Sequence, residues 1–371
     1  MDLIASPEQD ELRSSVRRFL ERKSPSDVVR TLMDDPAGYD PAVWSQMADQ
    51  LGLQGLTIPE EFGGSGFGFV ELTIVLEEMG RVLLPSPYFS TVVLAAQAIL
   101  DSGDTDAAKQ LLPGIADGST IATLAFTEQS GHWDLNSIEM SATHEGDSWT
   151  LSGTKSYVID GHIAGLIIVA AQTDAGLTLF AVDGTAAGLC ATAVPALDQT
   201  RKLATINFDA VAGTLIGTPG SATQSLAKTL DKVALALASE QVGGAQRAMD
   251  MAVAYSKIRT QFDQPIGSFQ ALKHRASEVM LRVESARAAA YYGAWAVAED
   301  SDEVPTVASL AKAYCSEAYF HAAAENIQMH GGIGFTWEHD AHLYFKRAKA
   351  SQLFLGDGTY HRERLADLIG I

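Results

Sequence analysis

Apolar residues recur at helical spacing through the first third of the chain. After Ser6 and Pro7, which are typical of a helix start, Leu12, Val16 and Leu20 form one apolar stripe. Two further amphipathic runs, VWSQMADQLGLQGL and FVELTIVLEEMGRVLL, predict two more helices. We therefore expect residues 1–120 to form an N-terminal all-α domain.

The pattern changes between residues 121 and 220, where short runs are rich in β-branched and aromatic residues. Four such runs, WTLSGTKSYVID, LIIVAAQ, LTLFAVDG and KLATINFDA, are bounded by Gly, Asp or Thr and predict strands. No helical pattern separates them, which favours antiparallel pairing in a barrel or sandwich over a parallel sheet. We expect residues 121–220 to form a middle β domain.

Helical spacing returns from residue 221 to residue 371. Three long runs carry apolar stripes: LAKTLDKVALALASEQVGGAQRAMDMAVAYSKIRT, FQALKHRASEVMLRVESARAAAYYGAWAVAED and VASLAKAYCSEAYFHAAAENIQMH. Long helices joined by short connections are typical of an up-and-down bundle. The sequence thus predicts an α+β protein in which residues 221–371 form a C-terminal four-helix bundle.

Composition argues against several classes of function. Lys and Arg total 26 and Asp and Glu total 46, so the formal charge is 26 − 46 = −20, which disfavours binding to nucleic acid. Cys190 and Cys315 form no CxxC pair and indicate neither a disulfide framework nor a zinc site. The run MDLIASPEQDEL lacks the basic residues of a targeting leader, and no run of about 18 apolar residues occurs. We expect a cytoplasmic protein without a membrane span.

Several common cofactor and hydrolase motifs are absent from the sequence. It contains no GxxxxGK(S/T) phosphate loop, no HExxH metal motif and no GxSxG nucleophile elbow. The four glycines between residues 63 and 68 follow a Pro-Glu-Glu turn rather than a strand, so we interpret them as a structural turn. His330, His339 and His342 lack metal-ligand spacing, and we interpret the turn WEHDAHLYFKR as carrying exposed polar residues.

Two segments are chemically more unusual. In RTQFDQPIG, the planar fork of Arg259 suits phosphate oxygens, and Gln261 and Phe262 add an amide and an aromatic wall. An arginine at a helix C-terminus is also explained by the helix dipole alone. In QMHGGIGF, Gly331 and Gly332 allow a cofactor to approach the backbone, but a helix C-cap accounts for them equally well.

Asp357 stands between two glycines, after an apolar run and before a predicted helix. A carboxylate confined in a partly dry pocket would have a raised pKa, which suits a general base. An ordinary N-cap or turn aspartate explains the same position on local grounds. The local pattern leaves both interpretations open.

Together these segments resemble the acyl-CoA dehydrogenase family. The match covers nearly the whole chain, in the order PEEFGG, FTE, SGTKSYVIDG, RTQFDQPIGSFQALKH, QMHGGIGF and GDGT. Members of this family hold FAD between the β domain and the C-terminal helices and across a subunit interface. The resemblance implies FAD-dependent α,β-dehydrogenation of an acyl-CoA thioester, with an electron-transfer flavoprotein as acceptor.

The resemblance also implies roles for individual residues. The residues of the β domain that would contact the flavin are Phe126, Thr127, Tyr157, Val158 and Ile159. The residues that would reach the FAD of a neighbouring subunit are Arg259, Gln261 and Phe262. Those on its pyrophosphate side would be Gln328, Gly331 and Gly332, and those near its adenosine half would be Thr359 and His361.

The terminal Glu-Gly-Thr of the family aligns its catalytic base with Asp357. Asp is one methylene shorter than Glu, and a misplacement of about 1 Å can lower a rate about 100-fold. Some relatives carry the base on the helix before the arginine motif, where this sequence has apolar Val233, so Glu240 is only a second candidate. The segment FTEQSGHWDL also departs from the glycine-rich loop usual after Thr-Glu, which helps to seat the flavin and CoA.

The run GFTWEHDAHLYFKRA and an aspartate at the base position resemble an actinobacterial branch that processes sterol or other bulky CoA esters. Several members are heterotetramers in which one subunit type lacks a complete site. Two hypotheses follow: a catalytic dehydrogenase subunit, or a non-catalytic partner that completes the flavin site of a paralogous chain. A third, an oxidase or monooxygenase on the same fold, predicts rapid reoxidation of the reduced flavin in air.

Overall fold

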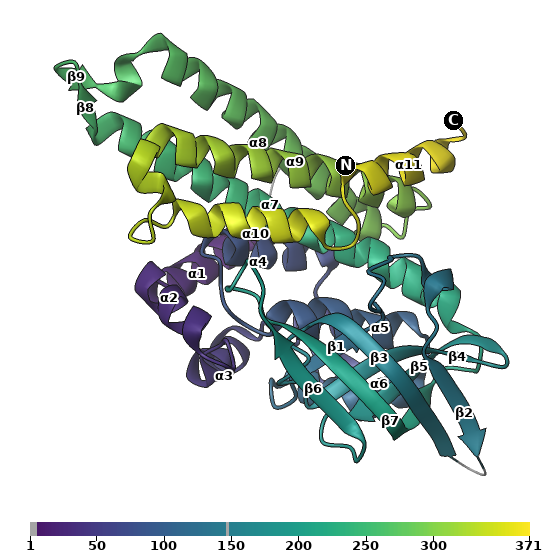
Figure 1. Cartoon of the computed structure of the whole chain (residues 1–371). Helices are drawn as coiled ribbons and strands as arrows, with labels where there is room; N and C mark the ends of the chain where they lie inside the picture. Colours follow the sequence, from purple (N-terminus) through teal and green to yellow (C-terminus); the bar gives the residue numbers. More distant parts are fainter. Residues whose placement is uncertain (1–5, 146–147) are drawn as a thin grey trace. The chain divides into compact units, whose positions relative to one another are not determined.

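The computed structural model describes residues 6–145 and 148–371 (Figure 1). The first five residues of the run MDLIASPEQDEL, on which the expectation of no leader partly rests, lie outside the described part. The chain divides into two compact units. Unit 1 is built from Met1–Thr31, Phe69–Leu84 and Ala234–Ile371, and unit 2 from Leu32–Gly68 and Pro85–Val233.

Unit 1 is helical. Its helices are α1 (Pro7–Lys23), α4 (Phe69–Arg81), α8 (Gln270–Ala298), α9 (Val304–His330), α10 (Ala341–Leu353) and α11 (Gly358–Ile369), with the part of α7 (Ala222–Ile258) that follows Val233. α2 (Ser26–Asp34) begins in this unit. Helix α9 packs against α8, α10 and α11, and Figure 1 shows α8 and α9 running side by side. The long helices predicted from the three C-terminal runs are confirmed.

Local chemistry sets the ends of these helices. Ser6 forms a capping box with Gln9: its Oγ accepts the N–H of Gln9 (3.3 Å), and the Gln9 side chain accepts the N–H of Ser6 (3.1 Å). Pro7 occupies the first helical position, where a backbone N–H would have no acceptor within the helix, so the lack of an N–H in proline costs nothing. Between α7 and α8 lies a short hairpin of β8 (Thr260–Gln261) and β9 (Gln264–Pro265), followed by a 3₁₀ turn, η4 (Ile266–Ser268).

Unit 2 combines short helices with the main sheet. The helices are α3 (Pro41–Leu51), the π-helix η2 (Phe89–Ala96), α5 (Gln97–Asp101), α6 (Thr105–Ala116) and the 3₁₀ turns η1 (Glu60–Phe62) and η3 (Leu135–Ser137). The turn predicted at residues 63–68 is confirmed. Gly63 has a φ of 87°, and a Cβ added to Gly64 would lie 2.0 Å from the carbonyl oxygen of Ile58.

Seven strands form the sheet of unit 2. They are β1 (Ala122–Ala125), β2 (Ser141–Glu145), β3 (Ser148–Ile159), β4 (Leu166–Thr173), β5 (Gly176–Asp183), β6 (Leu189–Val194) and β7 (Leu203–Ile216). The four predicted strand runs are confirmed as β3, β4, β5 and β7. Their inward side chains, with Leu151, Ile167, Phe180, Ile206 and Val211 among them, form one buried apolar cluster.

The expectation of antiparallel pairing holds for most strand pairs of this sheet but not for all of them. β1 pairs with β4 in parallel along four residues, and β2 meets β4 in parallel at Ser141 and Gln172. The remaining pairs, β2–β3, β3–β7, β7–β5, β7–β6 and β4–β5, are antiparallel. The chain between β1 and β4 includes β2 and β3, so it is long enough for the crossover that parallel pairing needs.

Candidate functional site

The two predicted flavin segments of unit 2 lie next to each other. Thr127, just past the end of β1, donates from its Oγ1 to the carbonyl oxygen of Ser156 on β3 (2.5 Å), and the N–H of Ser156 donates back to Thr127 (3.0 Å). Thr123 on β1 likewise donates to Ile159 (2.6 Å). These bonds bring Phe126 and Thr127 beside residues 157–159, so the FTE and SYVID motifs form one structural feature.

Within this feature the five predicted contacts differ in what they can offer a ligand. Phe126, Thr127, Val158 and Ile159 are buried, whereas the side chain of Tyr157 is 44% exposed. Tyr157 has a φ of 58°, at a point where the register between β3 and β7 shifts. At this shift the side chain of Tyr157 points outward while those of Val158 and Ile159 stay in the core. Tyr157 could therefore contact a ligand through its side chain, and Val158 and Ile159 through their backbone.

An ion pair between buried Lys155 and half-buried Glu128 anchors the loop that follows the FTE motif. Lys155 is fully buried, and its Nζ lies 2.8 Å from Glu128 Oε1 and 3.3 Å from the carbonyl oxygen of Phe126. Glu128 also accepts the N–H groups of Glu139 (3.0 Å) and Met140 (2.9 Å). Burial lowers the pKa of Lys155 to about 8 although the carboxylate opposes this shift. The motifs above do not single out Lys155; the one signal for it is a lysine inside a strand pattern.

The hairpin that carries the arginine motif in unit 1 is exposed. Arg259, Gln261 and Phe262 all present their side chains to solvent, and Phe262 is 86% exposed. Phe262 and Asp263 both have positive φ, at 52° and 61°, as a tight two-residue turn between strands requires. An aromatic side chain held outward in this way lies ready to contact another molecule.

The paired glycines at the end of α9 leave open space above their backbone. A Cβ added to either Gly331 or Gly332 would meet no atom within 4 Å, and Gly331 has a φ of 64°. The N–H of Gly331 donates to the last turn of α9, and Gln328 in that turn is exposed. The C-cap interpretation of Gly331 is therefore confirmed, and the approach of a cofactor to these glycines stays a prediction.

The interpretation of the turn WEHDAHLYFKR as carrying exposed polar residues is wrong for its histidines, since His339 is half-buried and His342 is buried. His330 and His342 are buried, and the ring of His330 stacks on Tyr255, with the two centroids 4.3 Å apart. Burial lowers the pKa of His330, His339 and His342, which keeps them neutral. Among residues 6–145 and 148–371, no cluster of His, Cys, Asp and Glu side chains is arranged to hold a metal ion.

Asp357 is the N-cap of α11. Its Oδ1 accepts the N–H groups of Thr359 (2.9 Å) and Tyr360 (3.0 Å), and the side chain is exposed. These bonds, above all the one from Tyr360, lower the pKa of Asp357, because they stabilise the charged form. The expectation of a dry pocket with a raised pKa is therefore wrong, and the simple capping interpretation describes the geometry.

The other two residues predicted in this region have different environments. Thr359 is exposed. His361 is buried, and its Nε2 lies 2.9 Å from the carbonyl oxygen of Leu355. Burial lowers the pKa of His361 to about 4, so the ring is neutral at physiological pH.

The second candidate base, Glu240, is committed to a buried ion pair. Arg347 Nη1 lies 2.9 Å from Glu240 Oε1, and both side chains are almost completely excluded from solvent. A carboxylate bound in this way already neutralises a guanidinium, and breaking such a pair costs about 3–5 kcal/mol. The geometry favours a structural role for Glu240.

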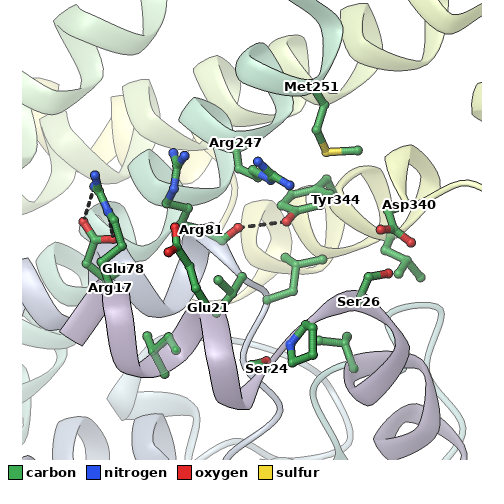
Figure 2. Close-up of a pocket in the computed structure, with 16 residues that line it drawn as sticks. Arg17, Glu21, Ser24, Ser26, Glu78, Arg81, Arg247, Met251, Asp340 and Tyr344 are labelled. Carbon is green, nitrogen blue, oxygen red and sulfur yellow. Dashed lines mark hydrogen bonds and ion pairs between the residues drawn. The ribbon is translucent and has the colours of Figure 1, made fainter. Parts of the chain in front are cut away.

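A cavity of about 280 Å³ in unit 1 lies apart from the predicted residues (Figure 2). Its walls come from α1, α2, α4, α7 and α10 and include Arg17, Glu78, Arg81, Arg247 and Tyr344. Figure 2 shows the ion pair of Arg17 with Glu78 on one side and the hydrogen bond from Tyr344 to the backbone of Arg81 on the other. None of the described residues predicted to bind cofactor or to act as base lines this cavity, so it is not their shared site.

Three family models cover the chain almost from end to end. The acyl-CoA dehydrogenase N-terminal domain matches residues 6–119, the middle domain residues 123–211 and the C-terminal domain residues 223–370. The chain belongs to the acyl-CoA dehydrogenase family. It is therefore an oxidoreductase that dehydrogenates acyl-CoA thioesters, with helical N- and C-terminal parts and a middle β domain.

Individual members of the acyl-CoA dehydrogenase family match over almost their full length. Acyl-CoA dehydrogenase IpdE2 of Mycolicibacterium smegmatis is 37% identical over 97% of this chain and 98% of that protein. A variant of the Tcur3481-Tcur3483 steroid ACAD superposes with a TM-score of 0.89 at 32% identity, covering 98% of each chain. The ChsE4-ChsE5 complex from Mycobacterium tuberculosis gives a TM-score of 0.91 at 27% identity, over 100% of this chain and 99% of that one.

This acyl-CoA dehydrogenase has no helix, in the part of the chain that the structure describes, with the length and apolar character needed to cross a bilayer.

Proposed function

We propose that this chain dehydrogenates bulky, ring-bearing acyl-CoA esters with bound FAD. One similar protein is named a steroid ACAD, which supports the substrate class. The observation that carries the cofactor part is the open space at Gly331 and Gly332, which lets a cofactor approach their backbone closely. FAD, when bound, accepts the hydride that leaves the β-carbon of the substrate.

We propose a role toward the cofactor for residues of each unit separately. In unit 1, Gln328 and the backbone of Gly331 and Gly332 would contact the pyrophosphate of FAD. Exposed Thr359 and buried His361 would lie near its adenosine half. In unit 2, Phe126, Thr127, Tyr157, Val158 and Ile159 take the flavin side. Arg259, Gln261 and Phe262 reach the FAD of a neighbouring subunit, which their exposure in this chain supports.

Asp357 is the proposed base for the α-proton. Both capping bonds use its Oδ1, so Oδ2 is the oxygen that would take the proton. The lowered pKa keeps the carboxylate ionised at neutral pH, but it also weakens the base. The shorter side chain and the weaker base together predict a slower proton transfer than a family glutamate would give.

The first experiment is the visible absorption spectrum of the chain purified alone, before and after anaerobic addition of a thioester. Octanoyl-CoA serves as a linear probe and cholanoyl-CoA as a ring-bearing one. We expect a yellow protein that bleaches faster with cholanoyl-CoA. Faster bleaching with octanoyl-CoA would contradict the substrate class, and rapid recovery of the colour in air would favour an oxidase.

A pair of variants tests Asp357 as base independently of its capping role. Asn caps a helix about as well as Asp, whereas Ala does not. Asp357→Asn should keep the flavin and the fold but abolish bleaching by thioester, and Asp357→Ala should lose activity and some stability. Bleaching of Asp357→Asn at the wild-type rate would exclude Asp357 as the base.

The proposed role of Gly331 and Gly332 in binding the cofactor is tested by Gly332→Ala. The backbone of Gly332 is not in the left-handed region, and the added Cβ meets no protein atom, so the apo-protein should melt at the wild-type temperature. We expect the flavin content after purification to fall at least tenfold. Gly165→Ala is the matched control, because its Cβ would make only an ordinary contact of 3.8 Å in unit 2. Full flavin content in Gly332→Ala would remove these glycines from the cofactor site.

A second arrangement is a heteromer in which this chain supplies only part of each site. The capping geometry of Asp357 favours it, and the similar ChsE4-ChsE5 structure is itself a complex. In that case the chain purified alone would be folded but nearly colourless. Co-expression with a paralogous chain would then restore the flavin and the activity.

The proposal extends to the domain boundaries, the form of the β domain and helix bundle, the location and the electron acceptor. We place domain boundaries near residues 120 and 220, which the matches to residues 6–119, 123–211 and 223–370 support. The pairing order β4-β2-β3-β7-β5 returns to β4, which supports a closed barrel, and the packing of α9 against its neighbours supports a C-terminal bundle of α7 to α10. We also propose a cytoplasmic location and an electron-transfer flavoprotein as acceptor.

A further inference from the structure

The turn between α10 and α11 has an unfavourable backbone conformation. Leu355 has a φ of 63° and Gly356 a φ of 95°, so two consecutive residues lie in the left-handed region. A glycine adopts this region freely, but a leucine does so only when its surroundings impose it. The next residue is Asp357, so the strain lies immediately before the proposed base.

Two buried side chains donate hydrogen bonds to the carbonyl groups of this turn. Lys312, on α9, lies with its Nζ 3.0 Å from the oxygen of Gly356 and 3.2 Å from that of Gln352. His361, in the first turn of α11, lies 2.9 Å from the oxygen of Leu355. The carbonyl group of Gln352, in the last turn of α10, and those of Leu355 and Gly356, beyond it, thus each have a side-chain donor from α9 or α11.

The environment of Lys312 is unusual for a lysine. Its side chain is fully buried, and in the described part of the chain all the oxygens that it hydrogen-bonds are neutral. The third partner is Ser316 Oγ at 3.1 Å, to which Gln241 on α7 donates from 3.0 Å. The titratable groups that act on it are Cys315 on its own helix, Asp357 in the turn and His361 on α11, and burial lowers its pKa to about 7.

We propose that Lys312 is a positioning residue, whose amino group holds the turn at residues 354–358 in its left-handed form and thereby fixes the place of Asp357. The inference rests on the proposed role of Asp357 as base. Both the charged and the neutral amine have enough N–H donors for the carbonyl groups of Gln352 and Gly356. These two hydrogen bonds, called the clamp below, therefore persist when Lys312 loses its proton. A lysine that served only to fill space could be replaced by an apolar side chain without effect on the turn.

The test replaces Lys312 with methionine, which is similar in length but donates no hydrogen bond. We expect the fold to persist, because methionine fills a similar volume and its introduction leaves no opposite charge unpaired. Amide hydrogen exchange in the peptide covering residues 353–361 should speed up at least tenfold. The rate of flavin bleaching should fall about 100-fold with little change in KM, as expected when a base is displaced by about 1 Å.

Lys349→Met is the matched control on α10. Lys349 is half-buried, and its Nζ bonds the Gln352 side chain (2.9 Å), so the chemical change is the same but the turn carbonyl groups keep their donors. This variant should show wild-type exchange and wild-type bleaching. Equal exchange at residues 353–361 in Lys312→Met and the wild type would overturn the proposal, as would an equal increase in both variants.

Two further results keep this inference separate from the proposed base. If Lys312→Met fails to fold, Lys312→Gln, which retains an N–H donor, replaces it. This variant should show an intermediate increase in amide exchange at residues 353–361. Wild-type exchange in Lys312→Gln together with about 100-fold slower bleaching would overturn the proposed role of Lys312. If Asp357→Asn bleaches normally while Lys312→Met shows fast exchange, the clamp stands and the base is elsewhere. If Asp357→Asn is inactive while Lys312→Met exchanges normally, the base stands and the clamp is wrong.

Discussion

Lys155 in unit 2 and Lys312 in unit 1 are both fully buried, yet they are stabilised in opposite ways. Lys155 bonds a carboxylate, Glu128, which in turn gathers two backbone N–H groups from the loop before β2. Lys312 bonds two backbone carbonyl groups and a hydroxyl. The first lysine is half of an ion pair, and the second is a hydrogen-bond donor whose charge is not needed for its contacts.

The difference predicts how each lysine responds to replacement. Removing one member of a buried ion pair leaves the other charge unpaired in a poorly solvated place. Removing a lone buried cation leaves no opposite charge behind, so the loss is confined to the groups that it bonded. Each lysine holds a loop near predicted site residues, but only Lys155 should be essential to the fold.

The largest expected effect is that of Lys155→Met. We expect the free energy of unfolding to fall by about 3 kcal/mol, because the half-buried carboxylate of Glu128 would be left without its cation. Lys312→Met should lower the same quantity less, by about 1–2 kcal/mol at pH 9, where the wild-type amine is uncharged, because it leaves carbonyl groups without a donor but no charge without a partner. Urea unfolding of both variants measures the contrast. A double variant, Lys155→Met with Glu128→Gln, should recover much of the loss; if it does not, the pair is not the cause.

A pH series sharpens the same comparison. Lys312 has a pKa of about 7 in the folded protein and 10.5 as an unperturbed side chain, so between these values the unfolded state binds the extra proton. Stability due to this group therefore rises with pH and is lost as pH falls towards 7. The stability of the wild type relative to Lys312→Met should increase by about 2 kcal/mol between pH 7 and pH 9. If the difference in unfolding free energy between the wild type and Lys312→Met does not change across this range, burial does not lower the pKa of Lys312.

The smallest effect concerns the helix cap that follows the clamped turn. Asp357→Ala removes the side chain that accepts the N–H groups of Thr359 and Tyr360, and should lower the free energy of unfolding by about 1 kcal/mol. Asp357→Asn should stay within a few tenths of a kcal/mol of the wild type. Urea unfolding at pH 7 distinguishes the two. Equal loss in both variants would mean that the negative charge, and not the cap, stabilises α11.

The sequence predicts the helical and β regions well because their hydrophobic periods differ and extend over many residues. The parallel pairing of β1 escapes prediction, since a four-residue strand carries no information about its partner. Asp357 illustrates a different limit: the position is predicted, but the pKa depends on which N–H groups fold back onto the carboxylate. Lys312 leaves a trace in the sequence, because it interrupts the buried face that Ala308, Ala311 and Cys315 define on α9.

The two thiols of the chain provide a built-in chemical reporter. Cys190 on β6 is exposed, whereas Cys315 on α9 is buried, with its Sγ 3.3 Å from the carbonyl oxygen of Ala286 and its pKa raised by burial to about 12. A maleimide dye at pH 7 should therefore label Cys190 at once and Cys315 only when α9 opens. Mass spectrometry of the second label would time that opening within one turn of Lys312, without any added mutation.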